Sequence, residues 1–390
     1  NRETILIKGA RVFEFEKIVA LLQRKIHGTR MEIDLNKMVH NLNFFKSRLN
    51  PGVKLMVMVK AFAYGSGSEE VASLLQYHRV DYLGVAYADE GVELRKSQIA
   101  LPIMVMNATE ESYATLISHS LEPVVYSVSI LKSLAAFLNG KTCSVHLEIE
   151  TGMNRLGIEQ QNLEEVISIL KVNKNINVAS IFSHLAGADD PTHDEYSQQQ
   201  LTLFEAAYKA ISEALTVEPI RHILNSPGIL RLKEFQLDMV RLGIGLYGVN
   251  PTSQSFDQLQ PVATLKTVIS QIKKITAGES VGYGRWGKVT QDITIATIAI
   301  GYADGFSRSF SKGVGAVLVK DKRAPVFGNV CMDMTMINVT GIDVKEGDEV
   351  IVFGDGLPIH DVAASINTIA YEILTNTSER VKRVFFADSF

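Results

Sequence analysis

The sequence predicts an α/β protein in which an eight-stranded barrel is followed by a smaller, mostly β domain. Two patterns lead to this prediction. From about residue 31 to residue 261, short apolar runs alternate with amphipathic helical patterns, as in repeated βα units around a parallel sheet. After Val262 the helical patterns give way to short β-type runs separated by Gly, Asp and Lys turns. The 390 residues leave room for roughly two to three folding units.

The first part contains eight apolar runs that qualify as buried strands: 54–59, 82–86, 103–106, 121–126, 144–149, 178–183, 222–224 and 238–241. Residues at helical spacing, such as Leu35, Met38 and Leu42, lie before or between them. Eight strands favour a closed, TIM-like (β/α)8 barrel, which typically needs about 250 residues. Because such barrels carry their chemistry at the carboxyl ends of the strands, we expect functional residues directly after these runs.

The second part contains five β-type runs and one late helical pattern: 265–269, 293–300, 317–319, 334–339, 350–353 and, for the helix, 360–374. We therefore predict three segments. They are an N-terminal tail at residues 1–28, the barrel at residues 29–262 and a C-terminal β domain at residues 263–390.

Composition and charge exclude several classes of protein. Hydrophobic residues make up 46% and charged residues 21%, so a disordered chain, a collagen-like fibre and a coiled coil are all disfavoured. The net charge of −4 predicts neither a nucleic-acid partner nor a membrane-surface partner. The two cysteines have no CxxC spacing, which predicts no metal site and a reducing, cytoplasmic location. No apolar stretch reaches the roughly 18 residues that would span a membrane.

The first candidate for chemistry is Lys60, which follows the run at 54–59 and precedes Tyr64, Gly65 and Gly67. A lysine at a strand end can be a simple solvated charge. However, a hydroxyl and open backbone amides can receive a phosphate while the lysine amine forms an imine with a carbonyl cofactor. We therefore interpret this segment as a cofactor site.

Two further segments can bind an anion. Arg241 precedes a run of glycines that includes Gly243, and Ser226 follows the run at 222–224 at the expected start of a helix. Glycines at this spacing also make ordinary tight turns. Two such sites on adjacent strands favour a phosphate.

A third group of motifs carries polar, aromatic and thioether side chains: Glu148, Arg155, His184, Tyr283, Tyr302, Met332 and Asp333. Each has a simpler interpretation. Arg155 can be a surface charge, His184 a hydrogen-bonded core histidine and Tyr283 a strand aromatic.

Together, six motifs resemble the alanine racemase family, fold type III proteins that depend on pyridoxal 5'-phosphate and whose lysine lies in a motif like Val-x-Lys-Ala-x-Ala-Tyr-Gly. The resemblance covers about residues 31–385 and keeps the family's order. It implies the same barrel-plus-β architecture and interconversion of L- and D-alanine for peptidoglycan. It also implies a homodimer with a shared active site.

The resemblance also implies roles for the cofactor-binding residues. Lys60 would hold the cofactor covalently, His184 would lie against the pyridine ring and Arg241 would face the ring nitrogen. Four residues would receive the phosphate: Tyr64, Ser226, Gly243 and Ile244.

Other residues are implied to act on the substrate. Tyr283 of the partner subunit would be a second catalytic base opposite Lys60, because inversion needs one acid/base group on each face of a planar intermediate. Arg155 and the backbone of Met332 would receive the substrate carboxylate. Tyr302 and Asp333 would line the entrance.

The sequence departs from the family pattern at several positions. Many relatives have a carbamylated lysine where Glu148 stands, so we predict that Glu148 pairs with Arg155 directly or through water. Phe62 and Ser66 replace an Asn and a His that are common near the lysine. Glu379 stands where some relatives have a phosphate-binding tyrosine, so that contact is not carried over.

Residues 5–19 resemble the last strand and helix of the ligase that adds D-alanyl-D-alanine to a muramyl peptide. This resemblance predicts the C-terminal part of a fused ligase–racemase, with an unrelated amphipathic extension as the alternative. Three functional alternatives also remain. They are a racemase of another small amino acid such as serine, a non-catalytic barrel that binds the cofactor, and a barrel-type amino-acid decarboxylase, which would place an acidic residue at the position of Arg241.

Overall fold

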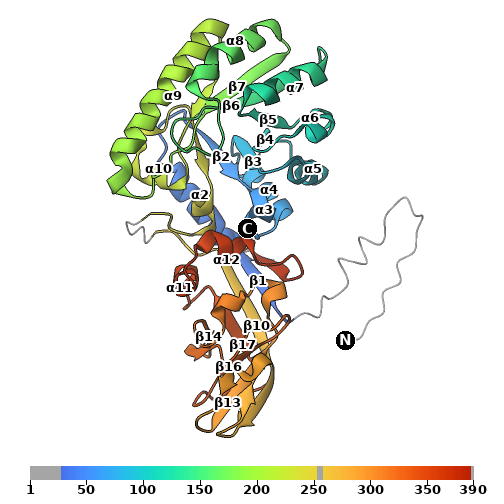
Figure 1. Cartoon of the computed structure of the whole chain (residues 1–390), viewed down its shortest axis with the longest axis vertical. Helices are drawn as coiled ribbons and strands as arrows, with labels where there is room; N and C mark the ends of the chain where they lie inside the picture. Colours follow the sequence, from blue (N-terminus) through green and yellow to red (C-terminus); the bar gives the residue numbers. More distant parts are fainter. Residues whose placement is uncertain (1–27, 253–257, 388–390) are drawn as a thin grey trace, which may run out of the picture.

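The computed structural model describes residues 28–252 and 258–387. Figure 1 shows two parts stacked along the long axis, with a barrel surrounded by helices at one end and a β domain at the other. The predicted N-terminal tail, with its ligase-like segment at residues 5–19, lies outside the described residues except for residue 28. The predicted fold class is confirmed.

The barrel has eight parallel strands: β2 (Lys54–Met58), β3 (Tyr82–Val85), β4 (Ile103–Val105), β5 (Glu122–Val125), β6 (Cys143–Glu148), β7 (Ile176–Phe182), β8 (Ile220–His222) and β9 (Met239–Leu242). Their order is β8-β7-β6-β5-β4-β3-β2-β9. Single backbone hydrogen bonds, such as Arg241 N to Leu224 O at 3.0 Å, join the β8 and β9 segments and nearly close the ring. Each strand lies close to a run that the sequence predicts.

Helices surround this ring: α2 (Leu35–Lys46), α3 (Lys60–Tyr64), α4 (Ser68–Tyr77), α5 (Ala88–Lys96), α6 (Tyr113–Ser118), α7 (Val128–Leu138), α8 (Leu163–Val172), α9 (Asp194–Leu215) and α10 (Ser226–Arg231). Helix α7 shows why they form. The Ser127 hydroxyl accepts a hydrogen bond from Ile130 N at the N-cap, and Asn139 ends the helix in a left-handed conformation. The buried residues Leu131, Leu134 and Leu138 lie on one face, toward the strands.

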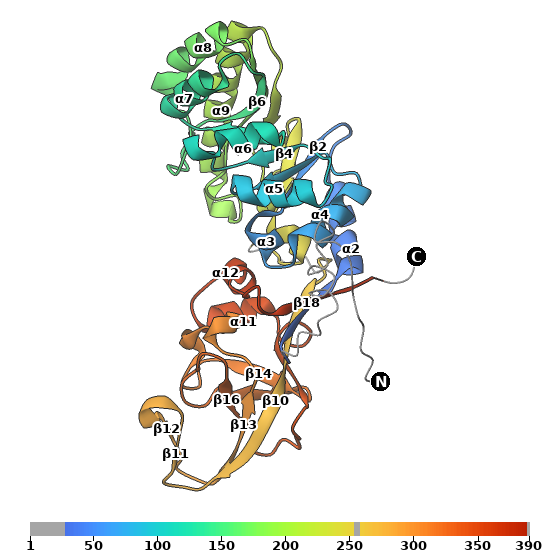
Figure 2. The same ribbon diagram turned by 90° about the vertical axis from the view of Figure 1, so that its right-hand side faces the viewer.

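The C-terminal domain contains β10 (Ala263–Ile275), β13 (Ile293–Ile298), β14 (Ala316–Val319), β15 (Lys322–Pro325), β16 (Thr335–Asn338), β17 (Glu349–Phe353), β18 (Lys382–Phe386), α11 (Ile359–Ser365) and α12 (Ala370–Thr375). A separate hairpin is formed by β11 (Ser280–Val281) and β12 (Gly287–Lys288). Figure 2 shows this hairpin at the end of the domain that lies away from the barrel.

Strand β1 (Arg30–Asp34) precedes the barrel in the chain but belongs to the sheet of the C-terminal domain. It pairs with β10 in an antiparallel ladder and with β18 in a parallel one. The barrel is therefore inserted between two strands of the other domain's sheet. The segment boundaries at residues 28 and 262 stay a prediction.

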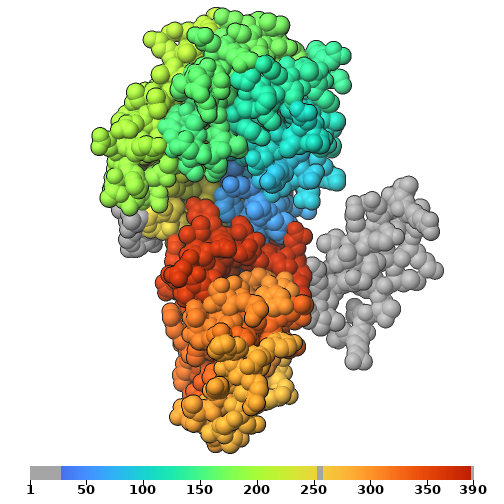
Figure 3. Space-filling view, in the orientation of Figure 1, coloured from blue at the N-terminus to red at the C-terminus, as the bar shows by residue number. Residues whose placement is uncertain are grey.

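The C-terminal domain covers the mouth of the barrel. In Figure 3 the segment coloured red, which includes α11 and α12, packs directly against the barrel. Helix α12 contacts α3, which follows the carboxyl end of β2. Residues from both domains therefore meet where the barrel strands end. Within residues 28–252 and 258–387, none of the helices has the length and apolar character needed to cross a membrane.

Candidate active site

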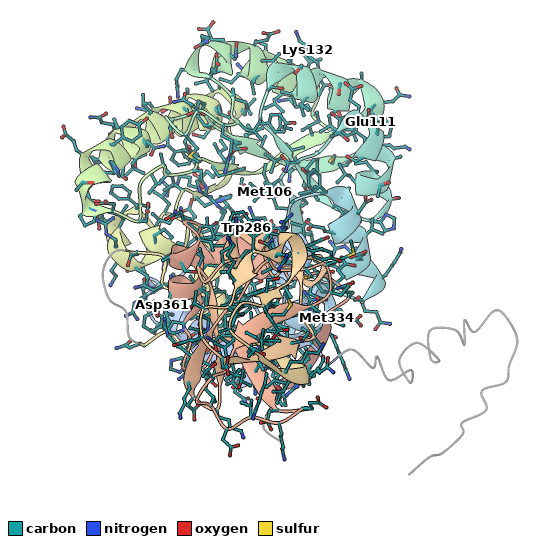
Figure 4. The ribbon with its side chains drawn as sticks, turned by 60° about the horizontal axis from the view of Figure 1, so that its bottom comes forward. Met106, Glu111, Lys132, Trp286, Met334 and Asp361 are labelled. Carbon is teal, nitrogen blue, oxygen red and sulfur yellow. The ribbon has the colours of Figure 1, made fainter. Side chains whose placement is uncertain are left out.

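A cavity of about 230 Å³ lies at the carboxyl ends of the barrel strands. Eight residues expected in the site line it together: Lys60, Tyr64, Arg155, His184, Ser226, Arg241, Gly243 and Ile244. None of its lining residues is acidic. Figure 4 shows another lining residue, Met106, inside the ring of the barrel. The structure therefore brings the barrel motifs into one electropositive pocket.

A larger groove of about 810 Å³ lies around the start of β8. Its charged residues include Arg221 and Asp238, which already pair with each other at 2.8 Å. The groove contains none of the expected site residues. We therefore place the site in the smaller cavity, where several unlike functional groups converge.

The segment after Lys60 has an unusual backbone. Residues 61–64 of α3 all have left-handed conformations, with φ between 50° and 55°, so α3 is a left-handed turn and not an ordinary right-handed helix. For residues other than glycine this conformation costs roughly 1–2 kcal/mol each. Hydrogen bonds hold the turn, including Ala61 N to Glu90 Oε1 at 2.6 Å and Gly65 N to Ala61 O at 2.9 Å. Strain of this kind persists only where the surrounding structure enforces it, and it is common at functional sites.

The turn directs the Tyr64 hydroxyl toward the backbone at Gly243. A Cβ atom on Gly243 would lie 2.9 Å from the Tyr64 hydroxyl and 3.7 Å from Ser226 Oγ. Ser226 Oγ accepts hydrogen bonds from Gly243 N at 2.8 Å and Gly245 N at 3.3 Å. Two hydroxyls thus converge on a glycine backbone, and a side chain at position 243 would fill the space between them. Hydroxyls and backbone amides are suitable donors to a phosphate.

Tyr371, on α12, lines the same cavity, although no sequence motif indicated it. Its ring centroid is 6.2 Å from that of Tyr64. Burial raises the pKa of Tyr371 to about 12, so its hydroxyl remains a hydrogen-bond donor at neutral pH. Met58 and Met106 are further lining residues that the sequence did not single out, and Asn225 and Pro227, which also line the cavity, flank Ser226 in the predicted anion site. No local pattern connects α12 with the barrel mouth, so only the fold could reveal Tyr371.

Arg241 is buried beneath the cavity and makes several hydrogen bonds. It donates to His222 Nδ1 at 2.7 Å, to Ser183 O at 2.8 Å and to Ile223 O at 3.1 Å. Burial lowers the pKa of Arg241 to about 10, against the opposing effect of Glu148, so the guanidinium stays charged at neutral pH. These bonds fix the direction of the guanidinium plane.

The charge of Arg241 acts on its neighbours in the cavity. Burial, and next Arg241, lower the pKa of His184 to about 3, which keeps the imidazole neutral. Burial, and next Arg155, lower the pKa of Lys60 below its ordinary value. A lower pKa increases the fraction of neutral amine, the form that attacks a carbonyl or accepts a proton.

Glu148 and Arg155 do not meet directly. Among the described residues no hydrogen bond or ion pair within 4.0 Å joins the two side chains. Burial raises the pKa of Glu148, and Arg241 and Arg155 both oppose this rise. The direct form of the predicted pairing is therefore absent. The form through water stays a prediction. Within residues 28–252 and 258–387, no cluster of three or more His, Cys, Asp or Glu side chains could hold a metal ion.

The candidates on the C-terminal domain do not line the cavity of this chain: Tyr283, Tyr302, Met332 and Asp333. Tyr283 is 75% exposed and lines a separate groove of about 430 Å³. Met332 is 54% exposed, Met334 49% and Trp286 59%. Figure 4 labels Met334 and Trp286 on this domain. Asp333 pairs with Arg380 at 2.8 Å. Four expected residues thus lie on an exposed face.

The fold and the lysine-containing cavity define a class of protein, the two-domain α/β-barrel enzymes. The family model "Alanine racemase, N-terminal domain" matches residues 33–251, and "Alanine racemase, C-terminal domain" matches residues 262–385. The alanine racemase of Clostridium tetani is 37% identical over 370 residues, which cover 92% of this chain and 95% of the relative. That of Desulfovibrio desulfuricans is 36% identical, with coverage of 91% and 97%.

Solved structures of alanine racemases have the same fold as this chain. The alanine racemase of Clostridium difficile 630 superimposes with a TM-score of 0.86 at 36% identity, covering 93% of this chain and 96% of that one. An alanine racemase structure from Bartonella henselae, described as having covalently bound pyridoxal phosphate, gives a TM-score of 0.84 at 29% identity, with coverage of 92% and 99%. The chain belongs to the alanine racemase family.

Proposed function

We propose that this chain is a pyridoxal-phosphate-dependent alanine racemase that interconverts L- and D-alanine and supplies D-alanine for peptidoglycan. One observation carries the proposal. The amine of Lys60, the hydroxyls of Tyr64 and Ser226, and the guanidinium of Arg241 converge in one cavity that has no acidic lining residue. Family membership gives independent support.

The residues around the cavity suit a phosphorylated aldehyde cofactor. When bound, pyridoxal phosphate supplies an aldehyde that couples to amines and a ring that withdraws electrons from the substrate Cα. Lys60 would hold the aldehyde end covalently. Tyr64, Ser226 and the backbone at Gly243 and Ile244 would receive the phosphate, and the Tyr371 hydroxyl would assist from α12.

Arg241 would face the ring nitrogen, with His184 against the ring. A guanidinium has only donors, so it cannot accept a proton from the ring nitrogen or stabilise a protonated ring nitrogen as a carboxylate would. The N–H groups that point away from the cavity donate to His222 and Ser183, which fix its orientation. This favours a racemase over a barrel-type decarboxylase, for which an acidic residue is expected at this position.

Lys60 and Tyr283 are the proposed catalytic pair. Inversion requires one group to take the Cα proton from one face and a second to return a proton to the other face. The lowered pKa of Lys60 suits it for the first role. Tyr283 is outside the cavity of its own chain, so the second role requires Tyr283 of the partner subunit. The proposal therefore includes a homodimer with a shared active site.

Exposed apolar side chains on the C-terminal domain support a dimer. Tyr283, Trp286, Met332 and Met334 are all about half-exposed or more. Exposed apolar clusters commonly mark interaction sites, and homodimers bury such patches by symmetry. In the assembled site the Met332 backbone would receive the substrate carboxylate opposite Arg155.

The remaining site residues have supporting roles in this proposal. Tyr302 and Asp333 would line the entrance. Backbone hydrogen bonds tie their segments together, with Tyr302 N bonded to Cys331 O at 3.0 Å and Ala303 N bonded to Met332 O at 3.0 Å. Glu148 would balance the positive charges of Arg155 and Arg241 from within the barrel.

Incubation with L-alanine in deuterated water tests the proposal. A two-base racemase should lose optical rotation while deuterium enters Cα. Exchange with full retention would remove Tyr283 from its role, and bound cofactor without any exchange would favour the non-catalytic barrel. A higher kcat/KM for L-serine than for L-alanine would favour the alternative racemase.

Two further expectations, the cellular location and the origin of residues 5–19, also remain proposals. The low cysteine content is consistent with a cytoplasmic location. The ligase likeness of residues 5–19 predicts a segment foreign to the racemase, so deletion of residues 1–27 should leave kcat and KM unchanged. A loss of racemisation on deletion would contradict it.

A further inference from the structure

A chain of hydrogen bonds crosses the barrel interior from Arg241 to Glu122. Arg241 bonds to His222 Nδ1 at 2.7 Å, and His222 Nε2 lies 2.8 Å from Ser180 Oγ. Ser180 Oγ lies 2.6 Å from His146 Nδ1, and His146 Nε2 lies 2.9 Å from Glu122 Oε2. The three middle side chains are fully buried. The chain thus connects a cation at the cavity with a carboxylate on β5.

The chemistry of the groups fixes the direction of every bond. An arginine has no acceptor, so His222 Nδ1 must accept and the proton of the neutral ring lies on Nε2. His222 Nε2–H therefore donates to Ser180 Oγ. The Ser180 hydroxyl then donates to His146 Nδ1, and His146 Nε2–H donates to Glu122. All donors point the same way, away from the guanidinium and toward the carboxylate.

The reverse arrangement is incompatible with the contact to Arg241. If Glu122 carried a proton and donated to His146, each following bond could reverse in turn. His222 Nδ1–H would then face the Arg241 N–H at 2.7 Å, and two donors cannot share a hydrogen bond. A charged His222 does not resolve this conflict, and burial and the Arg241 charge keep the pKa of His222 well below its ordinary value.

We propose that Glu122 and His146 are positioning residues that hold His222 in its Nε2–H tautomer, so that His222 Nδ1 stays the acceptor that orients Arg241 in the cavity. An ionised carboxylate accepts hydrogen bonds only, so Glu122 imposes from its end the same direction that Arg241 imposes from the other. The consequence for racemisation rests on the proposed function, whereas the tautomer of His222 does not.

Glu122 lies at the opposite end of the barrel interior from the cavity. It lines a small pocket of about 190 Å³ that also contains Cys143. The groups that face it are Tyr82 on β3, Arg95 on α5, and Cys143 and His146 on β6. The Tyr82 ring packs edge-on against His146, with centroids 5.9 Å apart. His146 is therefore held both by packing and by its hydrogen bonds.

The direct test is 15N spectroscopy of the holoenzyme labelled at its histidine nitrogens, with His222 assigned by substitution. Glu122→Gln retains the shape but replaces an acceptor-only group with one that also donates. We expect His222 in the parent to show an acceptor Nδ1 and a protonated Nε2, and Glu122→Gln to introduce the other tautomer. Glu164→Gln, an exposed change in the first turn of α8, should leave the spectrum unchanged. An unchanged His222 spectrum in Glu122→Gln would overturn the proposal.

Kinetics give a second test. Glu122→Gln should lower kcat by roughly 3- to 30-fold with little change in KM, because it changes the orientation of Arg241 and not substrate contacts. Ser180→Ala interrupts the same chain, so the double variant should be no slower than the slower single variant. If the losses of kcat in the two single variants added fully in the double variant, Glu122 and Ser180 would not act through one chain of hydrogen bonds. If the parent itself does not racemise alanine, the proposed function fails, while the spectra still decide the tautomer.

Discussion

The barrel cavity and the exposed face of the C-terminal domain differ in how complete they are within one chain. In the cavity, side chains from distant strands are buried and bonded to one another, as Arg241 is to His222 and Ser183. On the other face, Tyr283 is 75% exposed and Met332 54% exposed. The first region is complete within one chain, whereas in the proposed dimer the second region is completed by a partner subunit. The changes below test this difference, beginning with the largest expected effect.

Lys60→Ala should abolish function in the cavity. Without the amine there is no covalent link to the cofactor, and we expect kcat to fall by roughly 1,000-fold or more. Borohydride treatment followed by measurement of protein-bound chromophore checks the link. Lys171→Ala, an exposed change at the end of α8, is the control. Chromophore trapped on the Lys60→Ala protein would contradict the assignment.

Tyr283→Phe removes one oxygen atom from the exposed face. We expect a loss of roughly 100- to 10,000-fold in racemisation, the range for a general acid or base. The melting temperature should not change, because the side chain is largely exposed. Tyr77→Phe alters a tyrosine of similar exposure on the barrel and should have no effect. If Tyr283→Phe were as active as Tyr77→Phe, the proposed catalytic role of the exposed Tyr283 would be wrong.

Arg383 connects the two domains beside the strained turn. Its guanidinium donates to Gly65 O at 2.8 Å, to Ser378 O at 2.6 Å and to Thr377 O at 2.7 Å. Arg383→Met leaves these carbonyls without a partner, so we expect a loss of about 2–4 kcal/mol in the free energy of unfolding. Urea unfolding measures it, with Lys382→Met on the same strand as the exposed control. Equal losses in both variants would contradict this role.

The neutral buried histidines predict a pH dependence of stability. The pKa of His184 is about 3 in the folded protein, and that of an unfolded histidine is about 6.5. Between these values the unfolded chain binds the extra proton, so stability falls as pH decreases. We expect His184 to lower the free energy of unfolding by about 1.4 kcal/mol for each pH unit below pH 6. Urea unfolding at pH 6 and pH 5 should show a smaller slope in His184→Gln. An unchanged slope would exclude this contribution.

Tyr371→Phe should have the smallest effect. It removes one hydroxyl from the cavity wall and retains the ring, so cofactor affinity should fall by roughly 2- to 12-fold, the value of one hydrogen bond. Fluorescence titration of the cofactor-free protein with pyridoxal phosphate measures this change. Phe385→Leu, on β18, is a control for altered packing in the same domain. Unchanged affinity would place Tyr371 outside the phosphate site.

The sequence predicted the barrel well for a physical reason. Its strands are buried on both faces, so they are short continuous apolar runs, such as Leu55–Val59, bounded by polar residues and glycines. Motifs that follow these runs, such as Lys60 and Arg241, must meet at one end of a parallel barrel. The position of each motif in the chain therefore also indicated its position in space.

Other features depend on contacts that no local pattern encodes. The left-handed turn at residues 61–64 contains no glycine, and Glu90 and Arg383 hold it from elsewhere in the chain. Tyr371 reaches the cavity only because α12 packs on α3. The absence of direct contact between Glu148 and Arg155 depends on the path of the loop between them. Sequence spacing specifies none of these arrangements.

The location of β1 has a consequence for biosynthesis. This strand is made before the barrel, yet its neighbours β10 and β18 are the first and last strands of the following domain. During translation more than 200 residues separate β1 from β10, and β18 follows more than 100 residues after β10. The barrel can form meanwhile, but the sheet is completed only once β18 has also been made. Premature termination before β18 would therefore leave β1 with an open edge that can pair with other nascent chains.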